Sequence, residues 1–138
     1  MNKDKNRPFD ALFDPETLSR MFPPERADQF FDALLGDADE GAYDIRLAYK
    51  GMQENRLTFD IELHQRPGKC LVCSLTYGLP TVFSRHPVID IQGVVDQIAL
   101  HMEGNGRCAG WTLGRTREVS RQLHVVPLEI DLENESGR

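Results

Sequence analysis

Two cysteines separated by two residues form the most conspicuous chemical motif in this sequence. Cys70 and Cys73 have the spacing of zinc knuckles and of redox-active pairs. Both functions require the two sulfur atoms to converge, whereas the flanking residues alternate as in a strand, where residues i and i+3 face opposite sides. The pattern therefore favours two structural cysteines whose thiols diverge. A metal- or thiol-centred protein that uses Cys70, Cys73 and Cys108 is the alternative.

The second candidate site is a segment in which cationic and apolar side chains are mixed. Arg85 and His86 lie there, and Arg66 adds positive charge from a preceding turn. These groups could bind an anion beside the following helix, but Asp90 is placed to cap that helix and would compete for its amides. A small enzyme with a pocket near Arg85 and His86 is one alternative. We interpret residues 79–87 as a ligand or partner surface, with these binding residues: Leu79, Val82, Phe83, Arg85 and His86.

Basic and aromatic side chains also gather in the C-terminal third of the chain. The cluster comprises Arg107, Trp111, Arg115, Arg117 and Arg121. Such residues can bind RNA by stacking and phosphate contact. The chain, however, has a net charge of −6, and a nucleic-acid binder needs a basic footprint. We therefore expect the arginines to pair with carboxylates of the same chain, and we expect no nucleic-acid partner.

Three ionisable side chains alternate along one predicted strand. Asp60, Glu62 and His64 are suited in type to acid–base chemistry. No phosphate loop, nucleophile elbow or H-E-x-x-H motif accompanies them. The sequence therefore favours a solvated sheet face, no cofactor and no enzymatic activity.

The strongest structural signal is an alternation of apolar and polar residues on both sides of Pro67-Gly68. Residues 57–63 and 71–77 each place apolar side chains at every second position. This period is typical of strands with one buried face, and Pro-Gly favours a turn. We predict a hairpin with a three-residue loop. Its pairs are Leu63 with Cys73, Ile61 with Leu75, and Phe59 with Tyr77.

An earlier run, residues 43–49, alternates in the same way and predicts another strand. Pairing Tyr49 with Leu57 keeps apolar side chains on one face. Residues 42–77 are therefore expected to form a three-stranded antiparallel meander.

The C-terminal part predicts a further pair of strands. Residues 111–119 begin the pair, and residues 123–132 form the last strand. Because proline lacks an amide hydrogen, Pro127 places that strand at a sheet edge or at a bulge.

The clearest helix pattern covers residues 91–102, which we expect to pack centrally on the sheet. Asp90 is its N-cap, and Gly93 indicates close packing. Residues 78–87 show neither period and are expected to form a loop. The apolar stripe of the helix consists of Ile91, Val94, Val95, Ile98 and Met102.

Two short helices are predicted near the N-terminus. Asp14 and Pro15 suit the start of the first, and Pro23-Pro24 ends it. The second is expected to begin at Pro24 and to end at Gly36, with Phe30 and Phe31 in the core.

The overall composition is that of an ordinary globular domain. The 138 residues are 40% hydrophobic and 28% charged, which favours one domain over 1–138 with tails at 1–8 and 133–138. No long apolar run or signal-peptide pattern is present, so neither membrane insertion nor secretion is expected. Three cysteines, an odd number, do not suggest a disulfide framework and favour the cytoplasm.

The block RPGKCLVCSLTYGLPTVFSRHP, residues 66–87, resembles a family of small bacterial proteins without an established function. The expected order of elements is helix, three strands, helix, two strands. Over most of the chain that order, the size and the acidic charge are similar to class I type III secretion chaperones. This resemblance implies a small cytoplasmic dimer that holds an effector segment in extended form.

The sequence therefore predicts an α+β fold. A three-stranded meander and a C-terminal strand pair form its antiparallel sheet, packed by one central amphipathic helix and short N-terminal helices. The favoured function is a non-enzymatic binding or chaperone-like module. Its expected partner is a protein or peptide, and it is expected to form a homodimer.

Overall fold

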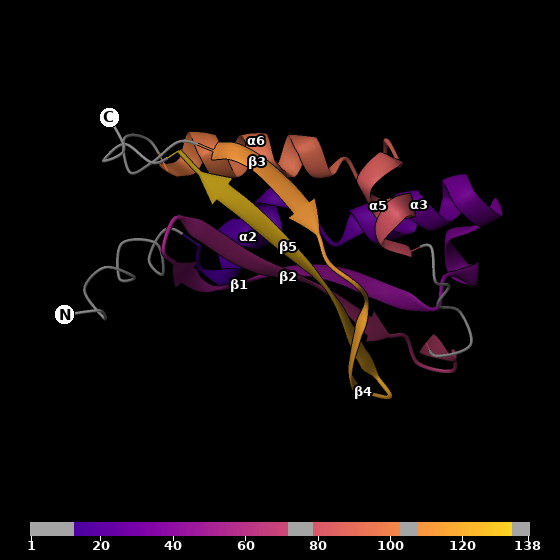
Figure 1. Cartoon of the computed structure of the whole chain (residues 1–138). Helices are drawn as coiled ribbons and strands as arrows, with labels where there is room; N and C mark the ends of the chain where they lie inside the picture. Colours follow the sequence, from indigo (N-terminus) through magenta and orange to yellow (C-terminus); the bar gives the residue numbers. More distant parts are fainter. Residues whose placement is uncertain (1–12, 72–78, 103–107, 134–138) are drawn as a thin grey trace.

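The computed structural model describes residues 13–71, 79–102 and 108–133, and it has an α+β fold (Figure 1). Five antiparallel strands form one sheet in the order β1-β2-β5-β3, and β4 also pairs with β5. The predicted fold class is confirmed. The strands are β1 (Tyr43–Gln53), β2 (Arg56–Gln65), β3 (Cys108–Leu113), β4 (Arg117–Ser120) and β5 (Leu123–Leu132).

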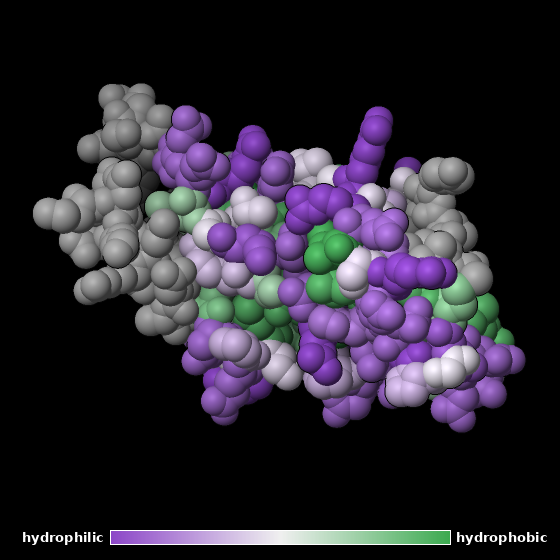
Figure 2. Space-filling model, turned by 90° about the horizontal axis from the view of Figure 1, so that it is seen from below, coloured by the Kyte–Doolittle hydropathy of each residue, from purple (hydrophilic) through white to green (hydrophobic). Residues whose placement is uncertain are grey.

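The helices lie on one side of this sheet, above it in Figure 1. Side chains on the helix-facing side of β2, such as Phe59 and Ile61, are buried in the core. Figure 2 shows the molecule from below, where hydrophilic side chains predominate around a small apolar area. The described helices are α2 (Pro15–Met21), α3 (Glu25–Leu35), the 3-10 helix η1 (Ala38–Glu40), α5 (Leu79–Arg85) and α6 (Ile91–Met102).

Strand β2 has partners on both edges, and this corrects the predicted hairpin. Leu63 lies between Ile45 of β1 and His124 of β5, not opposite Cys73. The backbone at Leu71 is helical, and residues 72–78 lie outside the described residues. The three-stranded meander is therefore replaced by the hairpin β1–β2, whose other neighbour is the C-terminal strand. A short alternating run does not by itself specify which strand it will pair with.

The register of β1 and β2 differs by two residues from the predicted one. Tyr49 pairs with Phe59, not with Leu57. A shift of two leaves every side chain on its predicted face, because side chains in a strand alternate with period 2. β1 is longer than predicted and ends in a tight turn at Glu54 and Asn55, with a register shift between Tyr49 and Gly51.

Strand β5 is central, whereas Pro127 had indicated a sheet edge or a bulge. It pairs with β2 on one side and with β3 and β4 on the other. Pro127 is accommodated because its carbonyl accepts a hydrogen bond from the Gly114 amide at 2.8 Å, where β3 has ended and β4 has not begun. The N–H and C=O of a strand residue point to the same neighbouring strand. The N–H that Pro127 lacks would therefore point to the gap between the end of β3 and the start of β4.

The predicted helix over residues 91–102 is confirmed. α6 covers residues 91–102, its whole apolar stripe is buried, and the Gly93 amide donates to Asp90 at 3.1 Å. A Cβ at Gly93 would overlap the Asp90 carboxylate, which confirms the predicted close packing. The segment expected to be a loop, 78–87, instead contains α5.

Helix α3 ends at Gly36 as predicted, with a left-handed φ of 83°. Phe30 and Phe31 are buried as predicted. The last turn departs from the core, because Leu34 and Leu35 are 52% and 51% exposed.

Replacing Gly41 with alanine is expected to lower the free energy of unfolding by about 1–3 kcal/mol. A Cβ at this position would overlap the buried ring of Phe31, which cannot move without disturbing the core. Urea denaturation of both variants is the measurement. Gly110→Ala is the control, because the space around Gly110 is open, and equal stability of the two variants would contradict the packing at Gly41.

Candidate functional site

A groove of about 700 Å³ runs between α2 and the outer edge of β1. Apolar side chains of α2 and its flanks form one wall, and β1 forms the other. The apolar lining residues are Phe13, Pro15, Leu18, Phe22, Pro24, Ile45, Leu47, Ala48 and Tyr49.

The backbone of β1 offers unpaired hydrogen-bonding groups to this groove. The Arg66 amide donates to the Ala42 carbonyl at 2.9 Å, so the backbone of Ala42 faces β2. Backbone direction alternates along a strand, and the backbone groups of Ile45 and Leu47 therefore face outward. Among the described residues no strand pairs with that edge.

Helix α2 is held in place beside β1, so the groove is preformed. The Thr17 amide donates to the Asp14 side chain at 2.9 Å, and hydrogen bonding from Thr17 lowers the pKa of Asp14. The ring of Phe13 lies 5.3 Å from that of Tyr49 and 5.2 Å from that of Phe59. These contacts join the start of the helix to β1 and β2.

Two cations lie on the polar face of β1, and one of them, Arg46, lines the groove together with the carboxylates of Asp14 and Glu62. Arg46 and Lys50 are exposed, and in the described part of the chain neither forms a hydrogen bond or an ion pair. Lys50 lies close enough to Asp60, a residue of the same face, for its positive charge to act on the Asp60 carboxyl group. Burial raises the pKa of Asp60, and the positive charges of Arg117 and Lys50 oppose that rise.

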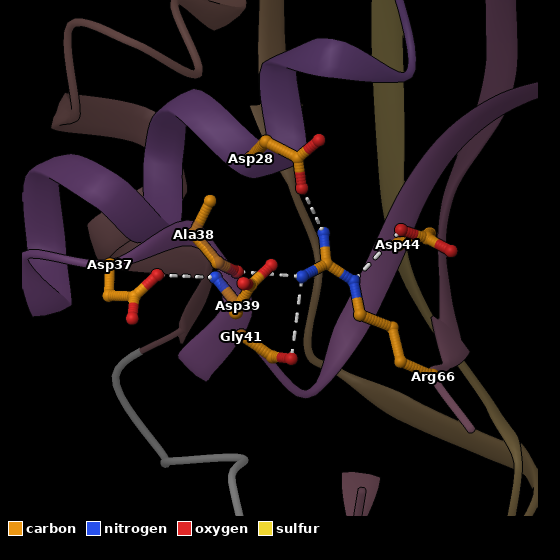
Figure 3. Close-up of polar contacts among 7 residues, drawn as sticks. All are labelled: Asp28, Asp37, Ala38, Asp39, Gly41, Asp44 and Arg66. Carbon is orange, nitrogen blue, oxygen red and sulfur yellow. Dashed lines mark hydrogen bonds and ion pairs between the residues drawn. The ribbon is translucent and has the colours of Figure 1, made fainter. Parts of the chain in front are cut away.

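Arg66, which the sequence suggested as an anion ligand, is instead bound by carboxylates of its own chain (Figure 3). Its guanidinium donates to Asp28 at 2.7 Å and to Asp44 at 2.9 Å, and its side chain is only 14% exposed. Another donor reaches the Ala38 carbonyl at 2.9 Å. The charge of Arg66 is neutralised, so this residue ties α3 and η1 to the sheet.

The predicted partner surface at 79–87 is only partly a surface. Phe83 is fully buried, with its ring 5.7 Å from that of Phe30. Val82 and His86 are half-buried, and Arg85 is exposed. The side chain of Leu79 lies outside the described residues. Binding by the five residues that the sequence suggested stays a prediction.

The cysteines differ from the predicted arrangement. Cys70 is disulfide-bonded, which contradicts a lone, diverging thiol at that position, and Cys73 lies outside the described residues. Cys108 has a free, half-buried thiol, whose pKa is raised by burial and by the charge of Asp96. No group of three His, Cys, Asp or Glu within the described ranges could hold a metal ion. A disulfide also gives no support to the expected cytoplasmic location.

Several of the remaining polar candidates pair within the molecule, whereas Arg115 and Arg121 form no ion pair in the described part of the chain. His64 and Glu62 are 2.8 Å apart, and Arg117 lies 3.7 Å from the buried Asp60. The Trp111 indole donates to Gln92 at 2.7 Å, across the gap between β3 and α6. Arg107 lies outside the described residues.

Searches with the sequence and the structure matched no protein-family model, no curated protein and no solved structure. The described part of the chain has two strands before α6 and three after it, not the three and two expected from the type III chaperone resemblance. None of the described helices has the length and apolar character needed to cross a membrane. The functional argument therefore depends on the geometry of the groove.

Proposed function

We propose that this protein is a non-enzymatic binding module that accepts an extended segment of a partner protein as an additional strand on β1. The observation that supports this most is the groove beside the outer edge of β1, a strand of 11 residues, where no strand within the described ranges pairs. In strand addition, backbone hydrogen bonds supply affinity, and pockets for alternate side chains supply specificity.

The geometry of β1 suits such a guest strand. A guest residue directly opposite Ile45 or Leu47 would share their face of the sheet and enter the groove under α2. The next guest residue would point to the polar face, beside Arg46. The groove therefore selects a segment with apolar side chains at every second position.

The test is a selection of random peptides of about ten residues, the length of a typical strand, against the whole protein. We expect the selected peptides to alternate, and we expect Leu47→Pro to abolish their binding while Leu47→Ala retains it. Both variants lose the leucine side chain, but only proline removes the outward N–H and places its ring against the guest. Proline at this position leaves the β1–β2 ladder intact, because the Leu47 amide faces away from β2.

Hydrogen exchange supplies the second measurement. On binding, the amides of Ile45 and Leu47 are expected to become protected, whereas those of Arg46 and Ala48 already point to β2 and should change little. Peptides that bind Leu47→Pro and Leu47→Ala equally well, or that leave the β1 amides unprotected, would show that the edge is not the binding site.

A further inference from the structure

We infer that the segment bound on β1 carries a tyrosine whose side chain lies on the polar face of the sheet, directly opposite Ala48. This inference rests on the proposed function and adds the chemical class of one guest residue to it. The helix side of the groove accounts for the apolar guest residues, and the part of the groove on the polar face accounts for the tyrosine.

The groove continues around the edge of β1 onto the polar face. Its lining includes Arg46, Ala48 and Glu62 as well as Ile45 and Leu47. Ile45 and Leu47 are buried, and because side chains alternate along a strand, Arg46 and Ala48 lie on the opposite face. Glu62 is the β2 partner of Arg46 and shares that face. A guest strand would therefore find space for side chains on both faces of the sheet.

Ala48 leaves a notch in the polar face. Its half-buried methyl group follows the long side chain of Arg46 along β1, and Glu62 lies behind them on β2. The guest residue directly opposite Ala48 would have this methyl group as its neighbour, with about 5 Å between the two Cβ atoms. Strands lie about 4.8 Å apart, a distance that an aromatic ring spans and that a serine or threonine side chain does not. Because the groove reaches Glu62, a long side chain is needed to fill it.

An aromatic ring in the notch would lie beside the guanidinium of Arg46. Arg46 is the cation that matters here, because it lines the groove, whereas the charge of Lys50 acts on Asp60. A guanidinium is planar and weakly hydrated, and it stacks on the faces of aromatic rings. The notch therefore favours an aromatic guest side chain over an aliphatic one.

Glu62 gives the reason for a hydroxyl group at the far end of the ring. One oxygen of its carboxylate lies 2.8 Å from the His64 ring, and within the described residues the other accepts no hydrogen bond. A phenol donates one hydrogen bond, which a carboxylate oxygen accepts. A charged guest residue fits less well, because an acidic one would meet Glu62 and a basic one would meet Arg46. Tyrosine combines the ring and the donor without a charge.

Three synthetic peptides test the inference by fluorescence anisotropy: KVTVYVTVK, KVTVFVTVK and KVTVAVTVK. The order of their side chains is palindromic, so a parallel and an antiparallel guest present the central residue in the same way. We expect the tyrosine peptide to bind about tenfold more tightly than the alanine peptide, because ring burial and stacking on Arg46 are added. The phenylalanine peptide should lie between them, because it lacks the hydroxyl donor.

Ala48→Leu fills the notch and should remove the preference for the aromatic peptides while the alanine peptide still binds. The readout is the ratio of affinities, since misfolding would weaken all three peptides together. Ala109→Leu is the matched control and should leave the ratio unchanged, because Ala109 is exposed on β3, at the other edge of the sheet.

Two further variants separate the ring from the hydroxyl group. Arg46→Ala should reduce the preference for both aromatic peptides over the alanine peptide, because it removes the stacking partner. Glu62→Ala should remove only the difference between the tyrosine and phenylalanine peptides, because it removes the acceptor.

The outcomes distinguish this inference from the proposed function. If none of the three peptides binds the unaltered protein, both fail together. If all three bind equally, or if Ala48→Leu keeps the preference for tyrosine, strand addition stands and the tyrosine is wrong. Sedimentation of a dimer that Leu47→Pro converts to a monomer would show a second copy on β1 and would also overturn the inference.

Discussion

Replacing Phe83 with alanine is expected to lower the free energy of unfolding by about 3–5 kcal/mol. The side chain is fully buried, and its ring meets Phe30 edge to face at 5.7 Å. Truncation would leave a cavity between α5 and α3 in addition to the lost burial. Chemical denaturation followed by circular dichroism measures the change.

The control on the same helix is Arg85→Ala. Arg85 is exposed, and its replacement should change stability by no more than about 0.5 kcal/mol. If Phe83→Ala were as stable as the unaltered protein, the docking of α5 on the core would be wrong.

Replacing Arg66 with alanine is expected to destabilise the protein by about 2–4 kcal/mol. Its guanidinium joins Asp28 and Asp44 and donates to the Ala38 carbonyl, so one substitution removes contacts from three elements (Figure 3). Asp28 and Asp44 are 57% and 49% exposed and regain water, which keeps the loss below that of a fully buried pair.

Two variants separate geometry from charge at this position. Arg66→Lys keeps the charge but cannot form the forked contacts, so it should recover only part of the loss. Arg56→Ala removes an arginine that also bonds two carboxylates but is 53% exposed, and it should cost less than about 1 kcal/mol. Equal losses for Arg66→Ala and Arg56→Ala would contradict a structural role for the contacts of Arg66.

Much of the local structure could be predicted from the sequence. The Asp14 cap and Gly36 mark the ends of helices by local hydrogen bonding and by a backbone conformation that glycine favours. The stripe in 91–102 matches the buried face of α6, because side chains three and four apart share one side of a helix. Alternation also placed the side chains of β1 and β2 on their correct faces.

Strand pairing could not be predicted in the same way. β2 takes β5 as its second neighbour, a strand about sixty residues away along the chain, while Leu71 turns into a helix. The alternating pattern of β2 is compatible with any strand that offers an apolar face, so the choice among them depends on how the whole core packs. The position of Pro127 was ambiguous for the same reason, because a break between two neighbouring strands serves it as well as a sheet edge does.

The sequence by itself determined the helices α2, α3 and α6, most strands and the faces on which their side chains lie, since each depends on neighbours a few residues away. Only the tertiary structure decided the candidate site. No motif marks the groove, because it arises where α2 settles beside the free edge of β1, and its binding groups are largely backbone amides and carbonyls, which every sequence has.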